Sequence, residues 1–443
     1  MQKLTTLFLP LVLSALLGAS NVQAEEEDAP DYEQGSLLGD FDGQRTAAWR
    51  AGWAVDAALR LDMLRTRASQ QPGSSSMTDF NFRVKADLEK IAGWQGAIAY
   101  LNVIDNRGRG VNARHVQGLM GESNIEVPVP TARIFHAWVQ QSFFEDQLTL
   151  LAGLYPIDSE FFVMDSASTL ISPPFGTPAD LALTRGPSIF NNSAFGLRAK
   201  WLSPDRTVYA MGALLDGVPN DPDHPRRTAV KFRQSEGNFF IGELGWMPLE
   251  YGHTFEPSTP TEGLPTKSLL AHEKYGGVSK YAVGFWRYSK RVNDQLLTDA
   301  QGDPLLTRSQ GAYALAERTL FSLGDSGRDF SVFGRYSRND GDSEPIKSSW
   351  NAGIRIRGPL ANRPDDTLAL GVTRSALANK YRAAQSLLAN ETATNETLWE
   401  ISWRAALTRY IAIQPVIQSI QHPAGSLEFP RVRTAGMRFE VLF

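Results

Sequence analysis

The chain ends in the stretch "RVRTAGMRFEVLF", residues 431–443, in which apolar and polar side chains alternate up to the final residue. Side chains of a strand point alternately to its two faces, so the apolar side chains of this stretch share one face. They are Ala435, Met437, Phe439, Val441 and Phe443. Most soluble domains end in a frayed polar tail. This ending predicts instead an amphipathic strand that belongs to a sheet with one apolar face.

The same alternation recurs along the whole chain. Its clearest examples are "VDAALRLDM" (55–63), "DFNFRVKADLEK" (79–90), "AFGLRAKW" (194–201), "SWNAGIRIRG" (349–358) and "TLWEISWRAAL" (397–407). Together with looser examples they make about sixteen segments of the roughly ten-residue length that a membrane β-strand requires. The pattern therefore predicts an all-β protein.

The connections between these segments fall into two groups. Tight turns such as "SPDR", "GDSGR" and "ANRPDD" join some neighbours, while long polar stretches separate others, at 104–132, 156–192, 216–237, 248–279, 289–309 and 375–396. Short turns on one rim and long loops on the other are typical of outer-membrane barrels. We therefore predict a transmembrane antiparallel β-barrel of about 16 strands with long extracellular loops.

The N-terminus supports export of the chain. "MQKLTTLFLPLVLSALLGASNVQA" has a basic residue, an apolar run too short to span a bilayer, and a small-x-small cleavage site. We expect residues 1–24 to be a cleaved signal peptide. Residues 25–52 would form a short periplasmic N-terminal segment with a short helix, and residues 53–443 the outer-membrane barrel.

Composition excludes several other classes of protein. The formal net charge of −4 argues against a nucleic-acid binder, and the absence of cysteine excludes disulfides and thiolate metal sites. The six histidines show no metal-ligand spacing. "NDPDHP" (220–225) offers oxygen ligands to Ca²⁺, although a solvated loop is the simpler interpretation. "GDSG" (324–327) falls in a predicted tight turn, so we do not expect it to be the catalytic motif of an enzyme. We also expect no cofactor and no metal.

Motifs along the mature chain resemble those of a known family. "LLGDFDGQRTAAWRAGWAVDAAL" (37–59) is similar to the mature N-terminal motif of the carbohydrate-selective, OprB-type porins of Gram-negative bacteria. Phe41 stands where the family usually has tryptophan, and the matching residues are Gly39, Asp40, Gly43, Arg45 and Thr46. The stretches "IFHAWVQQSFFEDQLTLLAGLYPIDSEF" (134–161) and "ETLWEISWRAALTRYIAIQPVIQSIQHPAG" (396–425) resemble further family segments in the right order.

The resemblance implies a function and partners. It implies passive, substrate-selective diffusion of mono- or disaccharides, such as glucose, across the outer membrane into the periplasm. The terminal strand resembles the signal read by the bacterial assembly machinery, carried here by Phe439, Val441 and Phe443. Expected partners are the carbohydrate, outer-membrane lipid and that machinery, and a homotrimer is left open.

Charged residues on the polar face of the strands are candidates for the sugar site. Arginine and carboxylate side chains hydrogen-bond sugar hydroxyls. Arg60 and Arg83 are the leading candidates, with Asp87 expected to orient Arg83. The full predicted pore lining is Arg60, Arg83, Asp87, Arg198, Arg355, Arg404 and Glu400. Loop 156–192 is expected to fold inward and narrow the channel, with Glu160, Phe161, Phe162 and Phe175 at the constriction.

Two alternatives remain at this point. The same arginines suit an anion- or organic-acid-selective porin, although the nearly balanced charge of the polar face argues against it. A barrel enzyme or a structural outer-membrane protein is the alternative of another class. For any single charged residue, simple solvation of the channel wall is an equally good interpretation.

Overall fold

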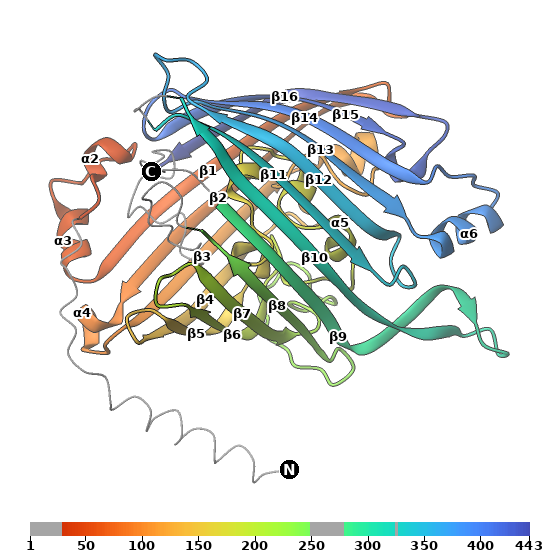
Figure 1. The fold of residues 1–443 in the computed structure, drawn as a ribbon, viewed down its shortest axis with the longest axis horizontal. Coiled ribbons are helices and arrows are strands. Elements are labelled where there is room, and N and C mark those ends of the chain that lie inside the picture. The colour runs from red at the N-terminus through yellow and green to blue at the C-terminus, as the bar shows by residue number, and fades with distance from the viewer. Residues whose placement is uncertain (1–28, 249–278, 324–326) are drawn as a thin grey trace, which may run out of the picture.

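The computed structural model describes residues 29–248, 279–323 and 327–443 as one closed antiparallel barrel (Figure 1). Each strand pairs with its neighbours in sequence, and β1 pairs with β16 to close the ring. Among the described residues there are sixteen strands, which confirms the predicted fold class. The predicted signal peptide and residues 324–326 of the "GDSG" turn lie outside the described residues.

The strands are β1 (Trp53–Arg67), β2 (Gly73–Asp87), β3 (Ala97–Gly108), β4 (Ala132–Phe143), β5 (Leu148–Tyr155), β6 (Ala194–Leu202), β7 (Val208–Asp216), β8 (Asn238–Trp246), β9 (Ser279–Thr298), β10 (Pro304–Ser322), β11 (Asp329–Asn339), β12 (Ile346–Arg357), β13 (Thr367–Leu377), β14 (Asn395–Ala406), β15 (Ile411–Gln421) and β16 (Arg431–Leu442). The helices are short: α2 (Tyr32–Gly35), α3 (Gln44–Arg50), α4 (Leu88–Ala92), α5 (Ala179–Ala182) and α6 (Asn379–Leu387). Single turns of helix are η1 (Asn112–Val116), η2 (Ile157–Ser159), η3 (Asp165–Ala167), η4 (Pro173–Phe175) and η5 (Pro423–Gly425). No helix among the described residues is both long and apolar enough to cross a membrane.

The two rims of the barrel differ. At the terminal rim, where β1 begins and β16 ends, lie α3, α4 and short turns such as 144–147 and 407–410. At the opposite rim, the loop rim, lie the longer connections, including 109–131, 156–193 and 378–394 with α6 (Figure 1). The predicted asymmetry between short turns and long loops is therefore present.

Two predicted long loops are placed differently by the structure. Stretch 248–279 joins the end of β8 to the start of β9, and antiparallel order puts both ends at the terminal rim; residues 249–278 lie outside the described residues. Stretch 289–309 is mostly strand, because β9 and β10 stay paired up to a turn at 299–303 (Figure 1). The backbones of β9 and β10 stay hydrogen-bonded in this stretch although its side chains form no apolar face. The side-chain pattern therefore could not predict that the strands continue.

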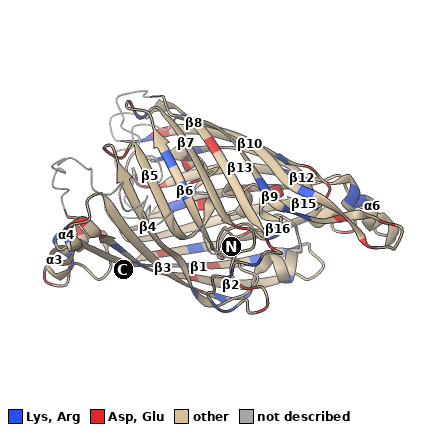
Figure 2. Ribbon diagram, turned by 90° about the horizontal axis from the view of Figure 1, so that it is seen from below, with Lys and Arg blue, Asp and Glu red and all other residues tan. Residues whose placement is uncertain are grey.

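The assignment of strand faces is confirmed. Phe82, Leu197 and Ile401 are 42%, 57% and 42% exposed on the outside of the barrel, whereas the neighbouring Arg83 and Arg198 are buried inside. Basic residues (Lys and Arg) and acidic residues (Asp and Glu) both occur along the strands as well as at the rims (Figure 2). The outward face is thus apolar and suited to lipid, and the charged side chains face the lumen.

The inward faces of β7 to β10 are largely apolar near the middle of these strands, apart from a few charged side chains such as Glu243 and Glu317. Inward-facing Met211, Phe239 and Trp286 are buried in one large cluster that also contains Phe161 and Phe162 of loop 156–193. This loop fills the lumen beside these strands, so their inward side chains meet protein rather than water. The alternation in their sequences is weak for that reason.

The N-terminal motif seals the seam between β1 and β16. The Arg45 guanidinium donates to the carbonyls of Gly39 at 3.0 Å, Val55 at 3.0 Å and Phe443 at 3.4 Å. Asp40 accepts from the backbone N–H and hydroxyl of Thr46 at 2.8 and 2.7 Å. The motif therefore folds into a clip that fixes the last residue of the chain against the first strand.

A charge on the outer face should destabilise the barrel. Phe82→Asp places a carboxylate in the lipid. A charge near the bilayer midplane costs about 2–4 kcal/mol for Arg or Lys and less for Asp or Glu. Lys85→Asp is the matched control, because Lys85 lies on the inward face of the same strand. Urea unfolding in lipid vesicles should show a clear loss of stability for Phe82→Asp only. Equal losses would contradict the assigned faces.

Candidate functional site

Loop 156–193 crosses the lumen and is held there by glutamates of the barrel wall. Glu243 of β8 accepts from the backbone N–H of Phe162 at 2.7 Å. Glu317 of β10 accepts from two successive N–H groups, those of Asp165 at 3.2 Å and Ser166 at 2.8 Å. Glu400 of β14 does the same for Ile171 at 2.6 Å and Ser172 at 2.9 Å. Each carboxylate therefore satisfies loop donors that would otherwise be buried without partners.

Donors of the wall satisfy the carbonyls of the same loop. The Arg335 guanidinium of β11 donates to the carbonyls of Phe162, Pro174 and Gly176. Gln414 of β15 donates to the carbonyl of Thr169. The loop is thus fastened on several sides of the barrel, which makes it a fixed obstruction of the channel.

Loop 109–131 is a second segment fixed inside the barrel. Ser123 donates to Asp62 of β1 at 2.6 Å, and Asn124 accepts from Arg438 of β16 at 2.7 Å. At the loop rim Glu396 accepts from the N–H groups of Leu119 at 2.8 Å and Met120 at 3.1 Å. The lumen is therefore narrowed by two loops, of which the sequence predicted one.

The four predicted constriction residues lie inside the barrel but anchor the loop. Glu160 accepts from Arg198 at 2.8 Å and from the Tyr155 hydroxyl at 2.6 Å, and it is 1% exposed. The phenylalanines at 161, 162 and 175 are buried between the loop and the wall. Because these rings are covered by protein, a solute in the channel cannot stack on them.

Arg83 and Asp87 are not brought together. The Arg83 guanidinium is buried and contacts Asp56 of β1 at 2.5 Å, directly across the strand pair. Asp87 ends β2 and caps α4, where its carboxylate accepts from the N–H groups of Glu89 and Lys90. The expected Asp87–Arg83 contact is wrong, because the chain leaves the strand at Asp87 and its side chain turns to the helix.

Three other predicted arginines are also engaged by the protein. Arg198 is bound to Glu160, Arg355 lies 3.3 Å from Asp329, and the Nε of Arg404 donates to Glu440 at 2.7 Å. All three are buried on the inward face. These three arginines and Glu400, which holds loop 156–193, therefore belong to the barrel wall and to its attachments to that loop.

Arg60 differs from the other predicted arginines. Its side chain is 43% exposed, and its nearest carboxylate oxygens, on Asp79 and Glu440, are 3.6 and 3.8 Å away. Both separations exceed an ordinary hydrogen bond. The guanidinium therefore lies in the lumen between two carboxylates with donors available to a solute.

Sequence reasoning missed several residues that shape the channel. Arg438 makes two bonds to Asp62, at 2.7 and 2.8 Å, opposite it across the seam. Glu243, Glu317 and Arg335 bind the lumen loop, as described above. They share one signal in the sequence: each is a charged residue at an inward position of its strand.

Asp221, one of the possible Ca²⁺ ligands at 220–225, is engaged in ion pairs instead. The carboxylate of Asp221 pairs with Lys231 and, at 3.0 Å, with Arg233. Lys231 and His224 hold the pKa of the Asp221 carboxyl well below its usual value. Within the described ranges no cluster of three histidine or acidic side chains has metal-binding geometry.

A closed sixteen-strand barrel with charged inner walls and inward-folded loops is the architecture of a porin-type channel. Residues 72–443 match the family model "Carbohydrate-selective porin, OprB family". The chain belongs to this family. It is therefore a β-barrel protein of the Gram-negative outer membrane, with the loop rim outside and the terminal rim in the periplasm.

Individual relatives agree with this placement. Porin B of Pseudomonas aeruginosa is 24% identical over 478 aligned positions, which cover 97% of this chain and 96% of the relative. The high-pH structure of Pseudomonas putida OprB has a TM-score of 0.77 at 18% identity, covering 94% of this chain and 100% of that one. The low-pH structure of Pseudomonas putida OprB has a TM-score of 0.58 at 16% identity, covering 93% and 99%.

Loosening one attachment of the loop should widen the channel. In Glu400→Gln an amide NH₂ faces the backbone donors of residues 171–172, and an unpaired buried donor costs about 1–3 kcal/mol. Single-channel recordings should show higher and noisier conductance than in the parent. The control is Glu145→Gln, at an exposed turn of the terminal rim. Unchanged conductance in Glu400→Gln would show that this carboxylate does not hold the constriction.

Proposed function

We propose that this porin conducts small neutral sugars, mono- or disaccharides such as glucose, by passive diffusion into the periplasm. The observation that carries the proposal is Arg60, half-exposed in a loop-narrowed lumen between the carboxylates of Asp79 and Glu440. A guanidinium has five donors and the carboxylates are acceptors, so the group complements the hydroxyls of a sugar.

Charge balance favours neutral solutes over anions. Arg83 and Arg438 each contact a carboxylate of a neighbouring strand, and Arg404 of β14 reaches Glu440 of β16 across β15. The inner wall therefore presents ion pairs rather than a basic stripe. An anion entering this lumen would gain little from the paired arginines and would meet the carboxylates as well. The organic-acid porin is accordingly the second candidate, and its signature would be anion selectivity.

The remaining roles follow from the same proposal. The inner surface binds and releases solute without chemistry, so we infer a channel rather than an enzyme. Weak binding suits this role, because flux requires release. We infer that residues 1–24 are removed on export, and that the outward face meets lipid.

Arg60→Ala should weaken sugar block while preserving the barrel. A hydrogen bond to a charged group contributes about 1.5–3 kcal/mol, and the lower end applies here because water reaches Arg60. Sugar-induced current block should therefore fall roughly tenfold in affinity. Arg65→Ala, on the outward face of the same strand, is the control. Unchanged block would remove Arg60 from the sugar path, and altered anion selectivity with unchanged block would favour the organic-acid porin.

Arg83 is expected to behave differently from Arg60, because its removal leaves Asp56 buried without its partner. Breaking such a pair costs about 3–5 kcal/mol. Arg83→Ala should therefore lower the stability of the barrel, rather than act mainly on sugar block as Arg60→Ala does.

The terminal strand should be needed for assembly. Phe443 donates its N–H to the carbonyl of Ala57 at 2.7 Å, and its own carbonyl oxygen accepts a hydrogen bond from Arg45. Phe443 therefore lies at the seam that closes the barrel. We propose that Phe443→Asp prevents recognition by the assembly machinery and lowers the amount of barrel in the outer membrane. Membrane fractionation measures this, with refolding in detergent as the control for intrinsic folding. Normal outer-membrane levels of Phe443→Asp would contradict the proposal.

A further inference from the structure

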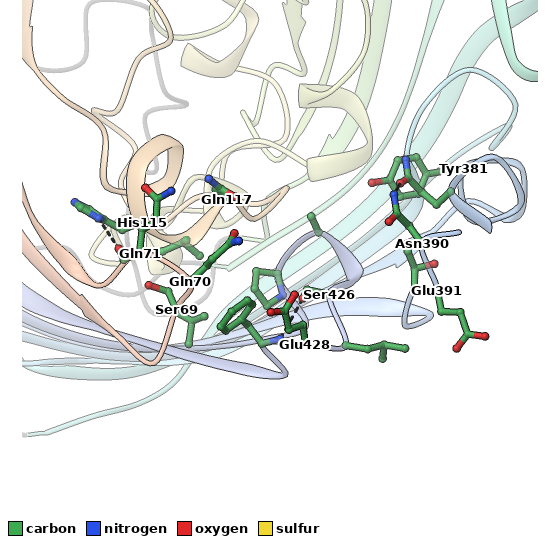
Figure 3. A pocket seen from close by; sticks show the side chains of 18 of the residues that line it. Ser69, Gln70, Gln71, His115, Gln117, Tyr381, Asn390, Glu391, Ser426 and Glu428 are labelled. Carbon is green, nitrogen blue, oxygen red and sulfur yellow. Dashed lines mark hydrogen bonds between the residues drawn. The ribbon is translucent and has the colours of Figure 1, made fainter. Parts of the chain in front are cut away.

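A polar cavity of about 420 Å³ lies at the loop rim, outside the channel site described above. Four connections line it: the β1–β2 turn, loop 109–131, loop 378–394 and the β15–β16 connection 422–430. Figure 3 shows Gln70 and Gln117 on one side, Asn390 and Glu391 on the other, and Glu428 between them. Its volume is within the range of pockets that bind small ligands.

The lining has an unusual composition for a surface of this protein. Among the described residues that line the cavity, none is a lysine or an arginine. Side-chain amides come from both sides, and two half-buried rings, Tyr381 and Phe429, contribute apolar faces. Within the described part of the chain, the amides of Gln70 and Gln117 form no hydrogen bond. They are free to bond a solute.

The cavity has a fixed base. The buried carboxylate of Glu396 accepts from Leu119 and Met120 of one connection and from Ala424 of another, the last at 2.6 Å. His115 bonds the carbonyl of Gln71 at 2.7 Å, which joins loop 109–131 to the β1–β2 turn. These bonds cross-link three of the four connections. The shape of the cavity is therefore set by the protein before any ligand arrives.

We propose that this cavity is an outer binding site for neutral saccharides, distinct from the Arg60 site. Amides donate to and accept from hydroxyl groups, and aromatic faces stack on the apolar face of a sugar ring. Glu391 and Glu428, with no compensating cation in the lining, disfavour anionic solutes. The inference extends the proposed sugar conduction, because capture at the mouth raises the local concentration of sugar above the constriction.

Saturation-transfer NMR on the purified barrel tests this site, with glucose and maltose as probes and gluconate as the anionic competitor. The double variant Gln70→Ala/Gln117→Ala should weaken sugar binding at least fivefold while small-ion conductance stays at the parental value. Phe429→Leu, which keeps an apolar side chain and removes the flat ring, should also weaken it. Gln301→Ala, an exposed amide at the β9–β10 turn, is the matched control and should bind as the parent does.

Arg60→Ala separates this site from the channel site. The outer-site signal should persist in Arg60→Ala even though sugar block of the current falls. Each of three results would overturn the outer site. These are parental binding in both cavity variants, loss of all binding in Arg60→Ala alone, and equal competition by gluconate. If Arg60→Ala leaves current block unchanged while the cavity variants lose binding, the channel proposal fails and the outer site stands.

Discussion

Closure of the barrel between β1 and β16 is the constraint on which the rest of the structure depends. Lipid offers no hydrogen-bond partners, so a spanning sheet cannot leave an open edge. The seam pairs ten residues of each strand, from Ala58 opposite Leu442 to Arg67 opposite Arg433. On its inward side Arg60 faces Glu440 and Asp62 faces Arg438, so opposite charges specify the register. The clip around Arg45 then ties the chain end to the first strand.

The same requirement for hydrogen-bond partners governs the interior. A loop folded into the lumen carries backbone groups away from bulk water, and the wall must satisfy them. The carboxylates of Glu243, Glu317, Glu396 and Glu400 accept hydrogen bonds from loop N–H groups, while Arg335 donates to loop carbonyls. These five side chains are engaged in attaching the loops, and other inward charges, such as Arg83, Arg404 and Arg438, are engaged in ion pairs. Few inward charged side chains remain available to a solute, and Arg60 is the clearest example.

Sequence periodicity predicted the strands, their approximate number and their two faces, and the pattern of short and long connections predicted the barrel. The inward folding of 156–192 was predicted from the length of that stretch. It could not show which inward charges pair with each other. Arg83 finds Asp56 across the β1–β2 pair and Asp87 finds a helix N-terminus, and both outcomes depend on register and on where a strand ends. The buried phenylalanines at 161 and 162 likewise depend on how the loop packs in three dimensions.

The central claim is that a charge-balanced, loop-narrowed lumen passes neutral sugars in preference to charged solutes of the same size. Liposome swelling with glucose, gluconate and glucosamine measures this most directly, since the three differ in charge at similar size. The account predicts that glucose enters fastest and that both charged analogues are slower. Faster entry of gluconate than of glucose, or equal entry of all three, would contradict it.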